Sequence, residues 1–283
     1  MLRQHAQTFR TAAWLGWQIE SNWTDPLLFF VFSVLKPISS VLILVFMYNV
    51  VAQTGPGDPV FAFIYLGNAF YIYVGAVMAG TSYAILDDRE RYRTLKYLYV
   101  APISVPVYLV GRAVARFVIG TLAVAITLAA GVLFFGLPIS LARVDWPLFA
   151  ASMLLGVASL ASLGLVLGAW TLTIRNEPWF LGEAVAAAMY LFSGAIFPLD
   201  ILPRWLQPIG FALPMSYWLE LVRRSVLGDA AAAFPTFAAL SDGQLLLILA
   251  AMTLILAAIA TVAFRFFDRV ARDRGLIDVV SNF

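Results

Sequence analysis

Side chains that could carry out catalysis are scarce in this sequence. His5 is the only histidine and there is no cysteine, so thiol nucleophiles and thiolate metal sites are absent, and one isolated imidazole is too little for metal binding or acid–base chemistry. Neither a Gly-x-x-x-x-Gly-Lys-Ser/Thr phosphate loop nor a His-Glu-x-x-His or Gly-x-Ser-x-Gly motif occurs. We therefore expect no catalytic residue, no metal site and no cofactor bound by this chain.

Ionisable residues inside long apolar stretches are the other candidates for chemistry. Glu183 lies about a turn inside such a stretch, close in sequence to Arg175 and Glu177. A carboxylate within a membrane is costly and marks a functional site by default, so Glu183 could line a path or a gate. Pairing with Arg175 near the membrane surface is the alternative, and the sequence leaves both open. Tyr71 and Tyr73 could line the same path, with core packing or lipid contact as the simpler role for each.

The composition identifies the elements that must hold these residues. Of 283 residues, 62% are hydrophobic and only 12% are charged, and the mean hydropathy is +0.89. A soluble domain carries about a quarter charged residues, so this chain is predicted to be an integral membrane protein. Its formal net charge of +2 is too balanced for a nucleic-acid-binding protein.

Six apolar stretches could cross a membrane core of about 30 Å as helices, which takes roughly 20 residues each. They are Leu27–Val51, Phe61–Leu86, Val105–Phe135, Pro147–Ile174, Phe180–Phe197 and Leu245–Phe264. None alternates polar and apolar residues as a barrel strand does, so we expect an all-α polytopic fold with one domain over residues 1–283. Residues 6–25 instead suit a helix lying in the membrane interface, with Phe9, Trp14 and Trp17 near one face.

The fourth stretch carries small residues separated by multiples of four, namely Ser152, Gly156, Gly164 and Gly168. Such residues clear one helix face for close packing. Packing inside the bundle is favoured over a subunit interface.

Positive charge sets the orientation, because cytoplasmic loops of membrane proteins carry an excess of Lys and Arg. With the N-terminus inside, thirteen basic residues fall in cytoplasmic segments and four in outer ones, namely Arg143, Arg204, Arg223 and Arg224. Lys36 lies within the first span, and its long side chain could reach the cytoplasmic surface. We expect both termini to be cytoplasmic.

The cytoplasmic connection between the second and third spans is dense in charge of both signs. It continues with Leu95, Leu98 and Tyr99 at helical spacing, and Pro102 ends it. This pattern favours a short helix over residues 87–101 along the cytoplasmic surface. From the charges alone, a solvated loop and a partner-binding surface both remain open.

The outer connection after the fifth span is interrupted by Pro198, Pro203, Pro208 and Pro214, each of which breaks a continuous helix. Its large apolar residues do not suit a wet loop; they are Ile201, Leu202, Trp205, Leu206, Ile209, Phe211 and Leu213. Short helices that dip into the outer leaflet satisfy both facts, because backbone at membrane depth must pack on protein or line a cavity. We expect this re-entrant segment, residues 198–228, to cover the outer end of the bundle.

The cytoplasmic connection resembles a motif in the membrane subunits of type-2 ABC exporters, which move drugs, polysaccharides or lipid-linked sugars out of bacteria. After span two that family has Glu, then Gly-Thr-Leu-Glu, a short apolar run and Pro. Four residues match this pattern: Glu90, Thr94, Leu95 and Pro102. Arg93 replaces the Gly and Lys96 replaces the second acidic residue, which leaves the details of docking open.

The outer connection resembles a second motif of the same family: Ser-Gly, an apolar pair and Pro, then Leu-Pro, Trp-Leu-Gln, and Leu-Pro before a helix ending in Arg. The matching residues are Ser193-Gly194, Phe197-Pro198, Leu202-Pro203, Trp205-Leu206-Gln207, Leu213-Pro214 and Arg223 or Arg224. With six spans and an interfacial helix, the resemblance extends over essentially the whole chain.

The resemblance implies that residues 87–101 form the coupling helix that docks on a separate ABC ATPase, through Glu90, Arg91, Arg93, Thr94, Leu95, Lys96 and Pro102. It implies two ATPase copies, which would bind ATP and Mg, and a second permease copy, with a homodimer preferred. An outer gate would contain Phe197, Pro198, Leu202, Pro203, Trp205 and Leu206.

The expected function is export of an amphipathic, lipid-like, drug or glycolipid substrate across the bacterial cytoplasmic membrane, in contact with membrane lipid. The alternatives are a polysaccharide-exporting permease of the same family and an ATP-independent channel-like or structural subunit.

Overall fold

The computed structural model describes residues 2–21, 58–174, 179–228 and 236–277, together with a few positions between 35 and 47. The predicted first span, Leu27–Val51, lies outside the described residues apart from those positions, and Lys36, Arg175 and Glu177 lie outside them altogether. Within the described ranges every regular element is a helix and none is a strand, as the all-α prediction requires.

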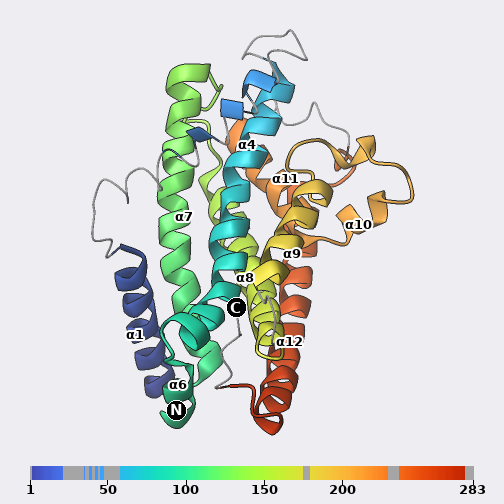
Figure 1. The fold of residues 1–283 in the computed structure, drawn as a ribbon. Helices are drawn as coiled ribbons and strands as arrows, with labels where there is room; N and C mark the ends of the chain where they lie inside the picture. The colour runs from blue at the N-terminus through green and yellow to red at the C-terminus, as the bar shows by residue number, and fades with distance from the viewer. Residues whose placement is uncertain are drawn as a thin grey trace.

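Four helical rods in these ranges are long and apolar enough to cross a membrane, and they run side by side in Figure 1. The first rod joins α4 (Pro59–Tyr73), η2 (Val74–Ala79), α5 (Gly80–Leu86) and η3 (Asp87–Arg91). The other three are α7 (Val105–Phe135), α8 (Trp146–Thr171) and α12 (Asp242–Asp273). The shorter elements are α1 (Leu2–Ser21), α6 (Leu95–Val100), α9 (Trp179–Phe192), η4 (Leu199–Ile201), α10 (Gln207–Phe211) and α11 (Pro214–Leu227).

Local sequence signals explain where the rods begin and end. Asp58 and Asp145 cap the first rod and α8 by accepting backbone hydrogen bonds at 2.9 and 3.0 Å, and a proline follows each cap. A capping box of Ser241 and Gln244 starts α12. Gly136 ends α7 with a φ of +63°, a conformation that only glycine adopts freely.

The predicted spans match these helices to different degrees. The third predicted span coincides with α7 at both ends. The helices that correspond to the second and sixth predicted spans extend further than predicted, to Arg91 and Asp273. The fifth prediction, Phe180–Phe197, is wrong at its end, because α9 stops at Phe192 and Gly194 turns the chain with a φ of +73°. The 14 residues of α9 rise only about 21 Å at 1.5 Å per residue.

The small-residue face of α8 packs inside the bundle, as predicted. A Cβ added to Gly156 would lie 2.2 Å from the indole of Trp218, and one on Gly164 would lie 2.6 Å from the carbonyl oxygen of Met78. These approaches leave no space for a larger side chain. The face therefore seats α11 and the first rod directly against the α8 backbone.

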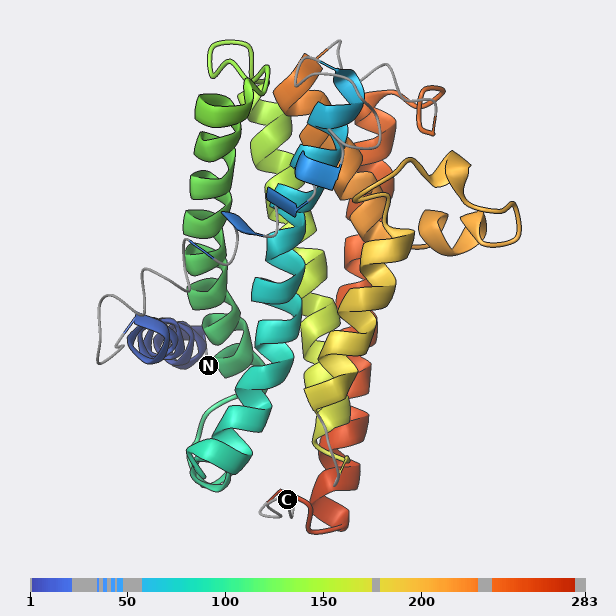
Figure 2. The same ribbon diagram turned by 45° about the horizontal axis from the view of Figure 1, so that its top comes forward.

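The N-terminal helix α1 crosses the lower end of α7. Figure 2 looks along α1 while the long rods run up the view, so the two directions differ greatly. The crossing is close, because a Cβ on Gly111 would lie 2.7 Å from Cβ of Ala12. Phe9, Trp14 and Trp17 stay exposed. The helix starts at Leu2, earlier than the predicted range of 6–25.

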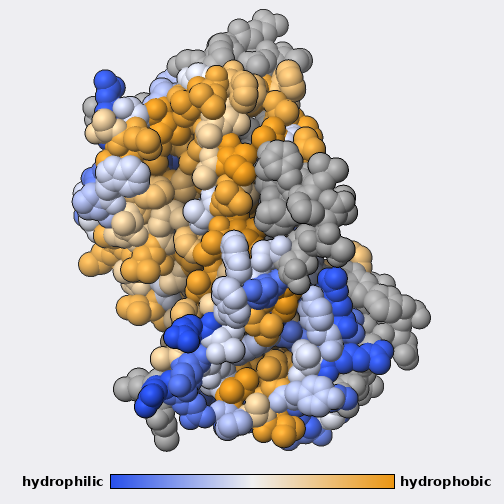
Figure 3. Space-filling model, turned by 90° about the vertical axis from the view of Figure 1, so that its left-hand side faces the viewer, coloured by the Kyte–Doolittle hydropathy of each residue, from blue (hydrophilic) through white to orange (hydrophobic). Residues whose placement is uncertain are grey.

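The surface changes character along the rods. In Figure 3, hydrophobic residues cover most of the upper part of one side, and hydrophilic residues gather toward the lower end around a smaller hydrophobic patch. Large apolar side chains such as Leu154 on α8 and Leu254 on α12 are more than 70% exposed. Such a surface suits contact with lipid hydrocarbon over the middle and upper parts of the rods.

Candidate functional site

The predicted coupling segment lies at the lower end of the first rod and is not one helix over residues 87–101. Asp87–Arg91 continues the rod, and α6 covers only Leu95–Val100. The chain turns between them at Arg93, whose φ of +53° lies in the left-handed region that interrupts a helix. The prediction is therefore corrected to a rod end, a turn and a short helix.

Arg93 stands where the family that the sequence resembles has Gly, and its conformation gives the physical reason. Left-handed backbone costs a residue with a Cβ roughly 1–2 kcal/mol, whereas the extra chain entropy of Gly costs about 0.5–1 kcal/mol. We expect Arg93→Gly to keep or raise the thermal unfolding temperature of the purified protein and Arg93→Val to lower it, since β-branched residues tolerate positive φ poorly. Equal unfolding temperatures for the two variants would contradict this explanation.

A buried ion pair ties the end of the first rod to α7. Arg112 Nη1 lies 3.2 Å from Asp88 Oδ1, and Tyr108 Oη donates to Asp88 Oδ2 at 2.9 Å. Arg112 Nη1 also donates to Tyr108 Oη at 2.9 Å. Only 2% of the Arg112 side chain and 3% of the Asp88 side chain are exposed. Because an unpaired buried charge is strongly destabilising, this network favours one arrangement of the two helices.

Arg89 ties the same rod end to α8. Its guanidinium donates to the carbonyl oxygens of Thr171 at 3.1 Å and Ile174 at 3.3 Å, which are acceptors that a helix C-terminus leaves without helical partners. Its Nη2 also lies 2.9 Å from Glu90 Oε1, and 10% of the Glu90 side chain is exposed. Glu90 therefore contributes to the interior of this region.

The helix α1 is linked to the region at both of its ends. Arg116 Nη2 of α7 lies 2.6 Å from Glu20 Oε1 and 4.0 Å from Asp87 Oδ2. Burial raises the pKa of the Glu20 carboxyl above its usual value, and the charge of Arg116 opposes that shift. The side-chain amide of Gln4 donates to the carbonyl oxygen of Pro102.

The short helix α6 has one side fixed to the bundle. Leu95 is 2% exposed and belongs to a buried apolar cluster with Ile85 and Leu109. Tyr99 Oη donates to Asp268 Oδ1 of α12 at 2.7 Å, and the Arg272 guanidinium lies 4.7 Å from the centre of the Tyr99 ring. A displacement of α6 would therefore act on α12 as well as on the first rod.

The opposite side of α6 and the turn before it is exposed and basic. Tyr97 is 66% exposed and Val100 is 86% exposed. We call this surface the coupling face, and it consists of Arg91, Arg93, Lys96, Tyr97 and Val100. Of the residues predicted to dock the ATPase, the structure places Arg91, Arg93, Thr94, Lys96 and Pro102 at the surface, with Leu95 and Glu90 turned inward.

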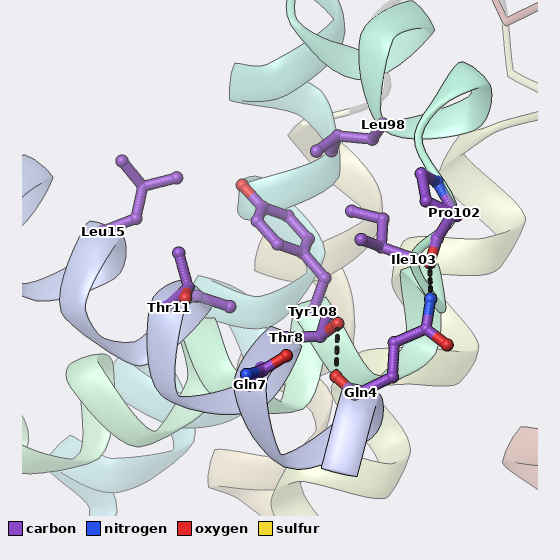
Figure 4. Close-up of a pocket in the computed structure, with 10 residues that line it drawn as sticks. Gln4, Gln7, Thr8, Thr11, Leu15, Leu98, Pro102, Ile103 and Tyr108 are labelled. Carbon is purple, nitrogen blue, oxygen red and sulfur yellow. Dashed lines mark hydrogen bonds between the residues drawn. The ribbon is translucent and has the colours of Figure 1, made fainter. Parts of the chain in front are cut away.

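A pocket of about 360 Å³ lies between α1, the loop that follows α6 and the start of α7 (Figure 4). Its lining is uncharged and consists of Gln4, Gln7, Thr8, Thr11, Ala12, Leu15, Leu98, Pro102, Ile103 and Tyr108. The volume is near the lower end of the about 300–1,000 Å³ usual for small-molecule sites. The hydrogen bond from Gln4 to Pro102 closes one side of the pocket.

The residues predicted to form an outer gate differ in burial, although Phe197, Leu202 and Leu206 pack against the same core cluster. Leu202 is 8% exposed and packs in the core, whereas Trp205 is 76% exposed. Phe197, Pro198 and Leu206 are half-buried, and Pro203 is exposed. Both ribbon views show α10 standing away from the rods.

The upper half of the bundle is filled by α11. Trp218 is fully buried and meets the rings of Phe70 and Tyr73 at centroid distances of 6.2 and 6.0 Å. Tyr73 also stacks on Phe117 at 5.4 Å and donates to Thr121 Oγ1 at 3.0 Å. Tyr73 is therefore a core residue of the described fold.

Arg223 of α11 is buried, although the sequence places it among the outer charges. Its Nη2 donates to the carbonyl oxygens of Gly194 at 2.8 Å and Ala195 at 3.1 Å, and its Nε donates to that of Phe63 at 3.2 Å. The guanidinium also lies 3.4 Å from the centre of the Phe63 ring. It joins α11, the first rod and the turn after α9. The terminal Arg of the outer motif was the signal in the sequence for this contact.

The other candidates for a path lie along the seam between the first rod and α9. Tyr71 donates to the carbonyl oxygen of Ala186, and its ring centre lies 4.6 Å from that of Tyr190. Glu183 is exposed and accepts a hydrogen bond from Tyr83 Oη at 3.0 Å. Tyr71 and Glu183 thus share one seam, and Tyr73 faces α7 instead.

These features define a polytopic helical membrane protein whose charged lower end is joined by ion pairs. Its described residues contain no group of side chains that could hold a metal ion. Residues 9–227 match the family model described as ABC-2 type transporter. The chain therefore belongs to this family and is a membrane permease, which confirms the resemblance based on the two motifs.

Two curated relatives have a similar sequence. They are the proteins named "Probable multidrug ABC transporter permease YbhR" of Escherichia coli strain K12 and of Escherichia coli O157:H7. Each is 29% identical to this chain over 157 residues, which is 54% of this chain and 40% of the relative. The match thus covers less than half of each relative's length.

Proposed function

We propose that this permease is the membrane subunit of an ATP-driven exporter and that a separate ABC ATPase docks on its coupling face. The observation that carries the proposal is an exposed basic and apolar surface on the hydrophilic end of a chain that belongs to the ABC-2 family. Exposed apolar patches rimmed by polar residues mark protein interaction sites, and Tyr97 and Val100 are exposed beside the three cations. The three cations of the coupling face, Arg91, Arg93 and Lys96, favour an acidic surface on the ATPase.

The contacts behind the coupling face offer a route for the motion. The rod end is joined to α7 through Asp88 and to α8 through Arg89, and α6 is joined to α12 through Tyr99. A shift of the coupling face would move four helix ends together. We infer that closure of two ATP-bound ATPase subunits displaces these ends and favours an outward-open bundle, as a shift between two populated states.

The proposed assembly contains two permease copies, as a homodimer, and two ATPases in the bacterial inner membrane. The segment Leu27–Val51 and α9 would complete six spans, and α1 would lie in the cytoplasmic interface with its aromatic residues toward lipid. Both termini would be cytoplasmic. ATP and Mg would bind to the ATPase, so this chain would not itself be an enzyme.

The substrate proposed here is an amphipathic drug-like or lipid-like molecule. The Escherichia coli relatives are named as probable multidrug permeases, and the apolar, charge-poor rods of this chain suit such a molecule better than a polar sugar chain. Transport would run from the cytoplasm or inner leaflet outward.

Reversing two charges on the coupling face should separate the permease from its ATPase. For Arg91→Glu/Lys96→Glu we expect at least about tenfold less of the co-expressed partner ATPase to copurify with tagged permease, because like charges across an interface cost several kcal/mol. The matched control is Arg204→Glu, which changes an exposed charge on the segment after α9 and should copurify normally. Undiminished copurification of the double variant would contradict docking at this face.

A further inference from the structure

One face of α9 is covered by no described element. Residues along it recur every three or four positions and are all exposed, so they form a continuous stripe on one side of the helix. We call it the α9 stripe, and it consists of Phe180, Glu183, Ala184, Ala187, Ala188 and Leu191. The opposite side packs inward, where Gly182 faces Ala79 of the first rod and Met189 is 3% exposed.

The carboxylate of Glu183 decides what the α9 stripe faces. Ionisable side chains in membrane helices nearly always face the bundle interior or a water-filled cavity, because hydrocarbon cannot solvate a charge. In the described part of the chain Glu183 has one polar contact, the 3.0 Å hydrogen bond from the neutral hydroxyl of Tyr83, and no ion pair. A hydrated path beside the lower end of the α9 stripe would solvate this carboxylate, which lipid tails could not.

The surroundings of Glu183 define the chemistry of a ligand. We propose that Glu183 binds the cationic group of a lipophilic cation, which deepens and rests on the exporter function proposed above. Tyr83 donates a hydrogen bond to the carboxylate, and Phe180, which is 59% exposed, comes three positions before Glu183 on α9. The faces of aromatic rings attract cations. The small side chains of Ala184 and Ala187 leave room for an apolar body.

The height of Glu183 in the bundle fits entry from the inner leaflet. Its partner Tyr83 comes five residues before Asp88 on the first rod, about 7.5 Å at 1.5 Å per residue. Glu183 therefore lies just above the charged lower end of the protein. An amphipathic cation keeps its charge near the lipid head groups while its apolar part stays in the membrane, so the charge reaches this level without crossing the hydrocarbon.

Two ions of nearly equal shape and opposite charge, tetraphenylphosphonium and tetraphenylborate, test the proposal. Their binding is measured by equilibrium dialysis to the full-length permease in lipid nanodiscs without ATP, with empty nanodiscs subtracted. We expect the wild-type protein to prefer the phosphonium. Glu183→Gln keeps the shape and an acceptor for Tyr83 but removes the charge, and should lower phosphonium affinity at least about tenfold, because the Coulomb attraction between two opposite charges at a partly dehydrated surface is lost. Glu183→Asp should retain the preference, and so should the control Asp273→Asn, which removes an exposed carboxylate at the end of α12.

Unchanged phosphonium affinity in a folded, monodisperse Glu183→Gln protein would overturn the proposal. An equal loss of both ions together with a lower unfolding temperature would also overturn it, because a structural pair with Arg175 predicts that result. These failures would leave ATPase copurification intact. If the proposed exporter function is wrong instead, the ATPase will not copurify with the wild-type permease, and the Glu183-dependent binding of the phosphonium will remain.

Discussion

Replacing Asp88 with Asn should destabilise the protein by about 3–5 kcal/mol, because removing one partner of a buried ion pair leaves the other charge without compensation. Arg112 would stay buried between the first rod and α7, and its other hydrogen-bond partner there, Tyr108, is neutral. The measurement is thermal unfolding of the purified permease, followed by tryptophan fluorescence. ATPase stimulation in the reconstituted complex should fall as well, since the rod end would no longer be fixed to α7.

A double variant separates charge burial from the loss of one contact. Asp88→Asn/Arg112→Met removes both charges and should recover most of the stability, because apolar replacements of buried ion pairs are often neutral or better. Asp242→Asn is the matched control, since Asp242 also pairs with an arginine but is 49% exposed, and its effect should stay within about 1 kcal/mol. If the Asp88 and Asp242 variants lose equal stability, the buried network does not have the proposed importance.

Replacing Arg223 with Met should have the second large effect, a loss of about 3 kcal/mol or more. The carbonyl oxygens of Phe63, Gly194 and Ala195 would lose their guanidinium donor in a buried site, and an unsatisfied buried acceptor costs about 1–3 kcal/mol. Arg223→Lys should recover only part of the stability, because a single ammonium cannot reproduce the planar fork of donors. We expect the thermal unfolding temperature to fall in the order wild type, Arg223→Lys, Arg223→Met.

A local probe tests whether the turn after α9 opens in the Arg223 variant. The chain has no cysteine, so Ala195→Cys, at a fully buried position, provides a single thiol. Its labelling by a soluble maleimide should be slow in the parent protein and several times faster with Arg223→Met. Arg204→Met, at an exposed position of the same connection, should not change the rate. Equal labelling in all three proteins would show that Arg223 does not hold this turn.

Parts of the fold were predictable where a single feature of the sequence decides the structure. The ends of α7 follow from a long apolar stretch preceded by a proline-bearing start and ended by Gly136. The packing of the α8 glycines follows from their separation by multiples of four residues, because only small residues allow helix backbones to approach so closely. The outer motif likewise indicated the family from the sequence alone.

The candidate site was predictable only as a segment of chain. Charge density and the family motif marked the predicted coupling segment, but Asp88, Arg89 and Glu90 are as hydrophilic in sequence as Arg91 and Lys96, which the structure leaves exposed. Which charges turn inward depends on partners far along the chain, such as Arg112 and the end of α8, and no local pattern encodes those partners.

The sequence by itself determined that this protein is a helical membrane protein, because hydrophobic burial in lipid depends on composition and segment length. Its motifs also determined the family. Only the tertiary structure decided that the coupling segment turns at Arg93, that α9 ends at Phe192 and that Arg223 is buried. Each of these depends on directional hydrogen bonds or backbone dihedral angles set by contacts between distant segments, which apolar periodicity cannot specify.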